Sequence, residues 1–167
     1  MRTSSAIAVL AAGLGVAVAG CRAGSQPSPS AFPVLEAKAR VLAGQSSACP
    51  DRARAEADAV AFRAKDAWDD HLAELAPPAR AALADWRPGF DAGESVVLAR
   101  AGELPNPGYR IVVEESDLPI RAGVLGLRLT AIPPPRERLQ AQVMTPACLY
   151  LWLDRADYRD VAVELAR

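Results

Sequence analysis

The chain has 167 residues, about the length of one domain, with 19 basic residues against 20 acidic ones. This balance excludes a strongly basic nucleic-acid module, because there is no excess of positive charge to neutralise phosphates. One histidine and three separated cysteines leave no set of four ligands at the spacing of a structural zinc site, so we expect no metal and no cofactor.

Residues 1–20 have the layout of a signal peptide. Arg2 is the only charge before an apolar stretch from Ala6 to Ala19, which is short for a helix that spans a bilayer. The run Val18-Ala19-Gly20-Cys21 resembles the lipobox of bacterial lipoproteins, whose cysteine is acylated and becomes the first residue of the mature protein. We therefore predict lipid attachment at Cys21. The alternatives are an ordinary signal peptide cleaved nearby and an uncleaved N-terminal anchor.

The residue after Cys21 indicates which membrane would hold such a lipoprotein. Lipoproteins retained in the inner membrane of two-membrane bacteria typically carry Asp there, whereas this chain has Arg22. Attachment to the outer membrane, facing the periplasm, is therefore favoured. Residues 21–33 are poor in large apolar side chains and rich in Ser and Pro, which predicts a flexible tether. Residues 34–167 are expected to form one domain.

The two remaining cysteines, Cys49 and Cys148, would lie in a compartment that permits disulfides. Only one intramolecular pairing is available to them, and it would close a loop of about a hundred residues. The alternative is two buried, inert thiols. A catalytic cysteine is disfavoured, because the single histidine, His71, lies in a helix-like segment and no other base is evident near either cysteine.

The first half of the domain predicts a strand followed by a helix. Pro33 to Ser47 fits a first strand and its turn, while Ala55 to Ala64 fits either a helix or a strand. The next segment predicts an amphipathic helix that Pro77-Pro78 ends, and a second short helical turn can follow over Ala79 to Asp85. The residues at helical spacing are Ala67, Trp68, His71, Leu72 and Leu75. Trp68 is then expected to anchor this helix in the core.

The second half predicts a sheet. Leu125, Leu127 and Leu129 alternate with other residues and would share one face of a strand. Six apolar runs have strand length and end at Pro, Gly or charged residues: Ser95 to Ala99, Tyr109 to Val113, Val124 to Ile132, Gln140 to Met144, Cys148 to Leu153 and Val161 to Leu165. The expected fold class is α+β and β-rich: an antiparallel sheet, a sandwich or a partly closed barrel, with one main helix.

Three short stretches of the chain carry a family resemblance. They are the run from Gly102 to Tyr109, which follows the strand at Ser95, the run from Gln142 to Cys148, and the run from Tyr158 to Val163. Together they resemble the PrcB-like family of bacterial envelope domains, which has a Gly-rich turn ending in Gly-Tyr and a later Thr-Pro segment before a strand. The founding type of that family is a lipoprotein subunit that binds and stabilises a protease. The resemblance therefore implies a non-enzymatic module whose partner is a protein, with a protease as one candidate.

The turn at Pro105 to Tyr109 is the predicted partner-binding site, through Asn106, Pro107, Gly108 and Tyr109. Two prolines fix φ, Asn106 tolerates unusual backbone angles and Gly108 can take a positive φ, so the turn is expected to be tight. A rigid loop can enter a partner's cleft at little entropic cost. It also resembles the Asn-Pro-Thr-Thr-Gly-Tyr loop of chagasin-like protease inhibitors, although it is shorter and lacks both threonines. A purely structural turn, an inhibitor and an accessory subunit of an envelope assembly are the alternatives.

Enzyme motifs are missing from the sequence, which has no Gly-x-Ser-x-Gly, no phosphate-binding loop and no His-Glu-x-x-His. The sequence therefore predicts no catalytic residues and offers no evident small-molecule substrate. Two groups of polar residues are expected to be solvated surface and not sites: Asp69, Asp70, His71 and Glu74 on the predicted helix, and Glu114, Glu115 and Asp117 after a strand.

Overall fold

The computed structural model describes residues 34–44, 49–50, 56–135 and 141–166. The predicted signal peptide, the predicted lipid attachment site Cys21 and the predicted tether lie outside the described residues. Residues 32–167 form one compact unit, and every residue of its two buried clusters belongs to that unit. The unit therefore has its own hydrophobic core, as an independently folding domain requires.

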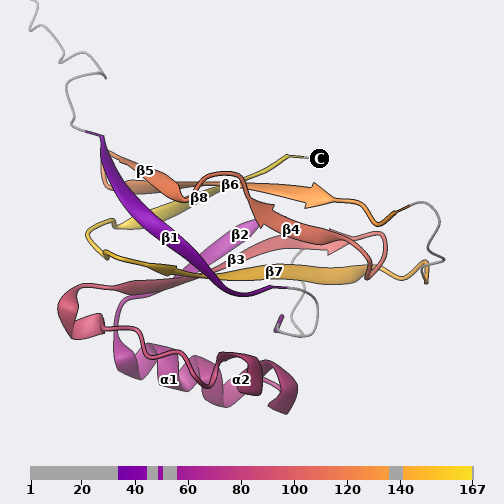
Figure 1. The fold of residues 1–167 in the computed structure, drawn as a ribbon, viewed down its shortest axis with the longest axis horizontal. Coiled ribbons are helices and arrows are strands. Elements are labelled where there is room, and N and C mark those ends of the chain that lie inside the picture. Colours follow the sequence, from indigo (N-terminus) through magenta and orange to yellow (C-terminus); the bar gives the residue numbers. More distant parts are fainter. Residues whose placement is uncertain (1–33, 45–48, 51–55, 136–140, 167) are drawn as a thin grey trace, which may run out of the picture. The chain divides into compact units, whose positions relative to one another are not determined.

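Eight strands and two short α-helices make up the described part of the domain (Figure 1). The strands are β1 (Leu35–Gly44), β2 (Asp58–Phe62), β3 (Ser95–Leu104), β4 (Arg110–Val113), β5 (Asp117–Arg121), β6 (Val124–Ile132), β7 (Thr145–Leu153) and β8 (Asp160–Ala166). The helices are α1 (Lys65–Glu74) and α2 (Pro77–Leu83), followed by a single 3₁₀ turn, η3 (Phe90–Ala92).

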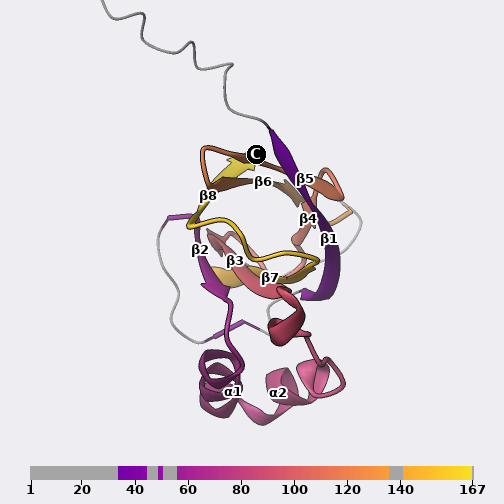
Figure 2. The ribbon, with the colours of Figure 1, turned by 90° about the vertical axis from the view of Figure 1, so that its left-hand side faces the viewer.

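The strands form one mixed sheet that is nearly closed into a barrel (Figure 2). Their order is β2-β3-β7-β1-β5-β6-β4, and β8 pairs with β6 on its other side. The β6–β8 pair is parallel and the other strand pairs are antiparallel. The predicted β-rich, partly closed barrel is confirmed, but a purely antiparallel sheet is not what forms.

The barrel interior is filled by alternate residues of its strands. Leu125, Leu127 and Leu129 of β6 are buried there, which confirms that they share one face. Leu151 of β7 lies opposite Val97 of β3, and both are buried in the same cluster. Each fully buried aliphatic side chain of this kind contributes about 1.5–3 kcal/mol relative to an exposed one.

A second buried cluster lies between the two helices and the outer face of β2, β3 and β7. Figures 1 and 2 show both helices on this side of the barrel. Trp68 of α1 is 2% exposed and packs there with Phe62, Leu98 and Tyr150, so its predicted role as a core anchor is confirmed. Because the interior lies on one side and the helices on the other, β3 is buried on both faces.

Two prolines set the boundary between the helices. α1 ends at Glu74, and α2 begins at Pro77, where the missing N–H and the fixed φ of proline suit a first helical position. The guanidinium of Arg80 donates to the carbonyl oxygens of Ala73 and Leu75 at 2.7 and 3.1 Å. The Arg80 side chain, on α2, thus provides hydrogen-bond donors for carbonyls at the end of α1 that have no partner within that helix.

Three segments differ from the expected elements or settle an ambiguity. The ambiguous segment at Ala55 to Ala64 contains β2. The predicted strand at Gln140 to Met144 is wrong for residues 141–144, which have no regular structure, because Val143 and Met144 point to solvent and β7 begins only at Thr145. β5 was not expected, yet its Leu118 and Ile120 alternate into the core.

Candidate functional site

The predicted contact loop, residues 105–109, crosses one end of the barrel. It connects β3 to β4, which are not paired with each other: β3 pairs with β2 and β7, and β4 pairs with β6. Asn106 Oδ1 accepts a hydrogen bond from the backbone N–H of Gly108 at 3.0 Å, as in an Asx turn. The loop is therefore braced from within and does not close a simple hairpin.

Near the predicted turn, a positive φ occurs at a glycine other than the one that the sequence suggested. Gly108 does not adopt a positive φ, and its N–H donates to the side chain of Asn106. Gly102 has a positive φ of 78°. It lies at the register shift of β3, which falls between Arg100 and Gly102. An extra residue in one strand produces this kind of bulge, and Gly is the residue that tolerates it best.

The loop is packed down on the start of β7. Asn106, Pro107 and Tyr109 line a small hollow of about 10 Å³ together with Thr145 and the two residues after it. Leu104, the residue before the loop, pairs with Thr145. The loop therefore sits at the start of β7, with Asn106, Gly108 and Tyr109 partly buried and with Pro105 and Pro107 exposed at its tip.

Two large apolar side chains lie in the open beside this loop. Val143 is 59% exposed and Met144 is 54% exposed. They directly precede Thr145, whose pairing with Leu104 places them at the same end of the barrel as the loop. We call residues 105–109 together with Val143 and Met144 the loop end. These two residues were not predicted as contact candidates, because an apolar pair before Thr-Pro is typical of the beginning of a strand.

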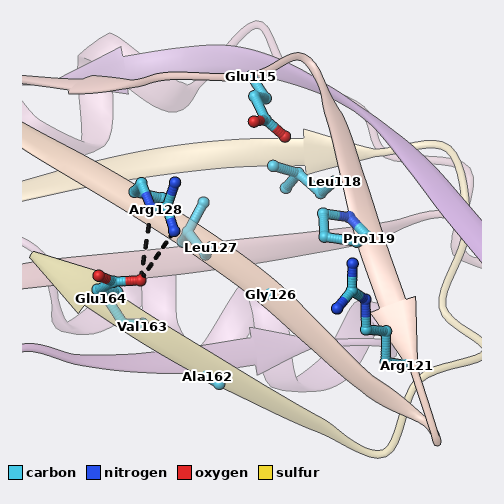
Figure 3. A pocket seen from close by; sticks show the side chains of 10 residues that line it. All are labelled: Glu115, Leu118, Pro119, Arg121, Gly126, Leu127, Arg128, Ala162, Val163 and Glu164. Atoms are coloured by element: carbon cyan, nitrogen blue, oxygen red, sulfur yellow. Dashed lines mark hydrogen bonds and ion pairs between the residues drawn. The ribbon is translucent and has the colours of Figure 1, made fainter.

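A shallow depression of about 390 Å³ lies on the outer face of β5, β6 and β8 (Figure 3). Gly126 lies opposite Ala162 and puts no side chain into the depression, and a Cβ added to Gly126 would lie 3.4 Å from Pro119 Cγ. Arg128 at its rim is bonded to Glu164 at 3.3 Å. The residues that line this depression include no serine, cysteine or histidine, and its two carboxylates are Glu115 and Glu164, the second of which is paired with Arg128.

The single histidine is partly buried and packs toward the sheet. His71 Nε2 lies 2.8 Å from the hydroxyl of Tyr150, and its ring stacks on Phe62 with the ring centroids 4.6 Å apart. The other members of the predicted polar group, Asp69, Asp70 and Glu74, are exposed. The three carboxylates of this group thus lie in the solvent, whereas the partly buried imidazole is hydrogen-bonded to a buried tyrosine.

Burial and charge both act on the His71 imidazole. Burial lowers its pKa below the ordinary value of 6.5, Glu74 raises it somewhat and Arg100 lowers it further. Arg100 is held by Asp58 in two hydrogen bonds of 2.6 and 2.9 Å. Burial also raises the pKa of the Tyr150 hydroxyl, so this group stays protonated and can donate to a neutral imidazole. The arrangement is a structural polar cluster under α1.

The lowered pKa of His71 predicts that the domain loses stability in mild acid. The unfolded chain takes up a proton near pH 6.5, whereas the folded chain resists it, so this contribution is complete above pH 6.5 and declines as the pH falls toward the folded-state pKa. We expect the urea midpoint of the wild type to fall between pH 7.5 and pH 5 more steeply than that of His71→Gln. Since the chain has one histidine, its imidazole resonance reports the pKa directly. A resonance that titrates at or above 6.5 would contradict the prediction.

The predicted disulfide between Cys49 and Cys148 is present. The two Cα atoms are 5.5 Å apart, within the usual range for a bridged pair. Cys148 is 1% exposed and lies on the outer face of β7, in the same cluster as Tyr150. The bridge therefore ties the connection between β1 and β2 to the centre of the sheet.

Comparison with known proteins adds no relative. No protein family, curated protein or solved structure matches this chain. The resemblance to the PrcB-like family therefore stays a prediction from short motifs. In the part of the chain that the structure describes, no helix has the length and apolar character needed to cross a bilayer.

Proposed function

We propose that this protein is a non-enzymatic protein-binding module of the bacterial envelope, and that its loop end is the contact surface. Lipid on Cys21 would hold it on the outer membrane, and residues 22–33 would let the domain stand off on the periplasmic side. A protease is the candidate partner that the motif resemblance implies, and binding would stabilise or position that partner.

The observation that carries this proposal is the pairing of a braced loop with exposed apolar side chains. The Asn106–Gly108 hydrogen bond and the packing on Thr145 fix the loop before any partner arrives, so little conformational entropy is lost on binding. Beside it, Val143 and Met144 offer apolar area that the domain itself does not bury. Methionine adapts its shape to a partner, and adjacent exposed apolar residues often mark an interaction site.

The packing of the loop favours a contact surface over an inhibitory wedge. Because Asn106 and Tyr109 are partly buried beside β7, the exposed Pro105 and Pro107 are the part of the loop available to enter an active-site cleft. We therefore expect the purified domain to bind its partner without blocking the partner's active site. Strong inhibition of a protease by the domain would instead favour the chagasin-like alternative.

The test is a crosslinked pull-down from the native envelope. We expect one predominant protein to be captured by the wild type and lost with Met144→Asp, and with Asn106→Ala combined with Tyr109→Ala. The matched control is Ala122→Asp, which adds the same charge to the exposed β5–β6 turn at the other end of β6. Its backbone has a φ of 52°, which Asp tolerates. Capture of the same proteins by all variants would show that the loop is only a turn.

A further inference from the structure

A groove of about 660 Å³ lies between α1 and the segment that follows α2, away from the loop end. Its apolar lining includes Trp68, Leu72, Trp86 and Phe90. Trp68 is almost fully buried and the other three are partly buried. A volume of this size with an aromatic and aliphatic lining is typical of sites that bind small molecules.

The charged side chains that line the groove carry more positive than negative charge. Lys65 forms an ion pair with Asp69 across one turn of α1, so these two charges offset each other. The guanidinium of Arg80 donates to the carbonyl oxygens at the end of α1, at 2.7 and 3.1 Å. Arg87 donates to the carbonyl oxygens of Ala84 and Trp86, the latter at 3.0 Å.

These neutral acceptors orient the two guanidinium groups without cancelling their charge. Among the described residues, neither Arg80 nor Arg87 lies within ion-pair distance of a carboxylate. Both line the groove beside the aromatic side chains. A ligand that matches this lining has an apolar body and an anionic end, because arginine bonds carboxylates and phosphates strongly.

We infer that this groove binds an anionic amphiphile, with a single alkyl chain on the aromatic and aliphatic floor and a carboxylate at Arg80 and Arg87. A groove between two segments can enclose a single alkyl chain. Binding to a bilayer surface would instead use apolar side chains that project from the protein. An extended peptide is disfavoured because the helix-end carbonyls that it could use are already bonded to Arg80 and Arg87. This inference does not depend on the loop end or on its partner.

Tryptophan fluorescence gives a direct test. The chain has three tryptophans, and Trp68 and Trp86 line the groove whereas Trp152 does not. In residues 22–167 carrying Trp152→Phe, we expect 12-bromododecanoate to quench the remaining fluorescence in a saturable way. The neutral 12-bromododecanol should bind at least about tenfold more weakly, since it cannot form charge-assisted hydrogen bonds.

Variants of Arg80 and Arg87 test whether these residues bind the carboxylate of the ligand. Arg87→Gln is expected to weaken bromododecanoate binding about tenfold, and Arg80→Gln by a similar factor where circular dichroism shows both helices intact. Arg121→Gln is the matched control, because it removes the same charge from the far depression on β5. Unsaturable quenching, equal binding of the alcohol, or no effect of Arg87→Gln would overturn the inference. Tighter binding to anionic phospholipid vesicles or to an acidic amphipathic peptide would overturn it in favour of those partners.

Discussion

Reduction of the Cys49–Cys148 bond is expected to lower the free energy of unfolding of the domain by about 3–5 kcal/mol. The two cysteines are 99 residues apart in sequence, so the bridge closes a long loop and removes many conformations from the unfolded chain. Urea unfolding of residues 22–167 with and without reductant measures the effect. This segment contains no third cysteine, so no other thiol takes part.

The double variant Cys49→Ser with Cys148→Ala is the control for that experiment. It should match or fall below the reduced wild type, because Cys148 is buried and its truncation also leaves a small cavity. Its unfolding midpoint should not respond to reductant. A wild-type midpoint that is the same in oxidising and reducing buffer would mean that the bridge adds nothing to stability.

Replacement of Trp68 by alanine is expected to cost about 3–5 kcal/mol. Its ring contacts Phe62 and Tyr150 edge to face, with the ring centroids 5.4 and 6.0 Å apart, and it fixes α1 on the sheet. Loss of the ring would leave a cavity beneath the helix that the barrel strands cannot fill. Chemical denaturation measures the loss, and near-ultraviolet circular dichroism should show weaker packing of the neighbouring aromatic rings.

Asp70→Ala is the matched control on the same helix. Asp70 is exposed, so its replacement should change the free energy of unfolding by about 0.5 kcal/mol or less. If the two variants were equally stable, Trp68 would not be an anchor and the contact of α1 with β2, β3 and β7 would contribute little to folding.

Local patterns predicted the parts of the fold that depend on local physics. Leu125, Leu127 and Leu129 alternate because one face of β6 lines the barrel, and Trp68 and His71 share a face of α1 because they are three residues apart. The sequence of β3 shows no such periodicity. Both of its faces are buried, so its apolar run does not say which residues point inward.

Features set by distant parts of the chain could not be predicted. β5 has only five residues and contains Pro119, which argues against a strand unless its neighbours on both sides are known. The parallel partner of β8 is likewise a long-range pairing. At the loop end, the residue types of Asn106 and Gly108 predicted a turn, but the nearness of Val143 and Met144 follows from the Leu104–Thr145 pair, which no local pattern encodes.

The order of strand pairing also bears on when the protein can fold. β1 finds its partners only after β5 and β7 have been synthesised, and β6 gains its parallel partner only with β8. Contacts between such distant segments form slowly, because the entropy of closing the loop between them is lost before the strand pairs contribute any stabilisation. If the predicted signal peptide directs export of an unfolded polypeptide, the chain must stay unfolded while it crosses the membrane. The pairing that holds the finished barrel together would thus delay folding until most of the chain has been exported.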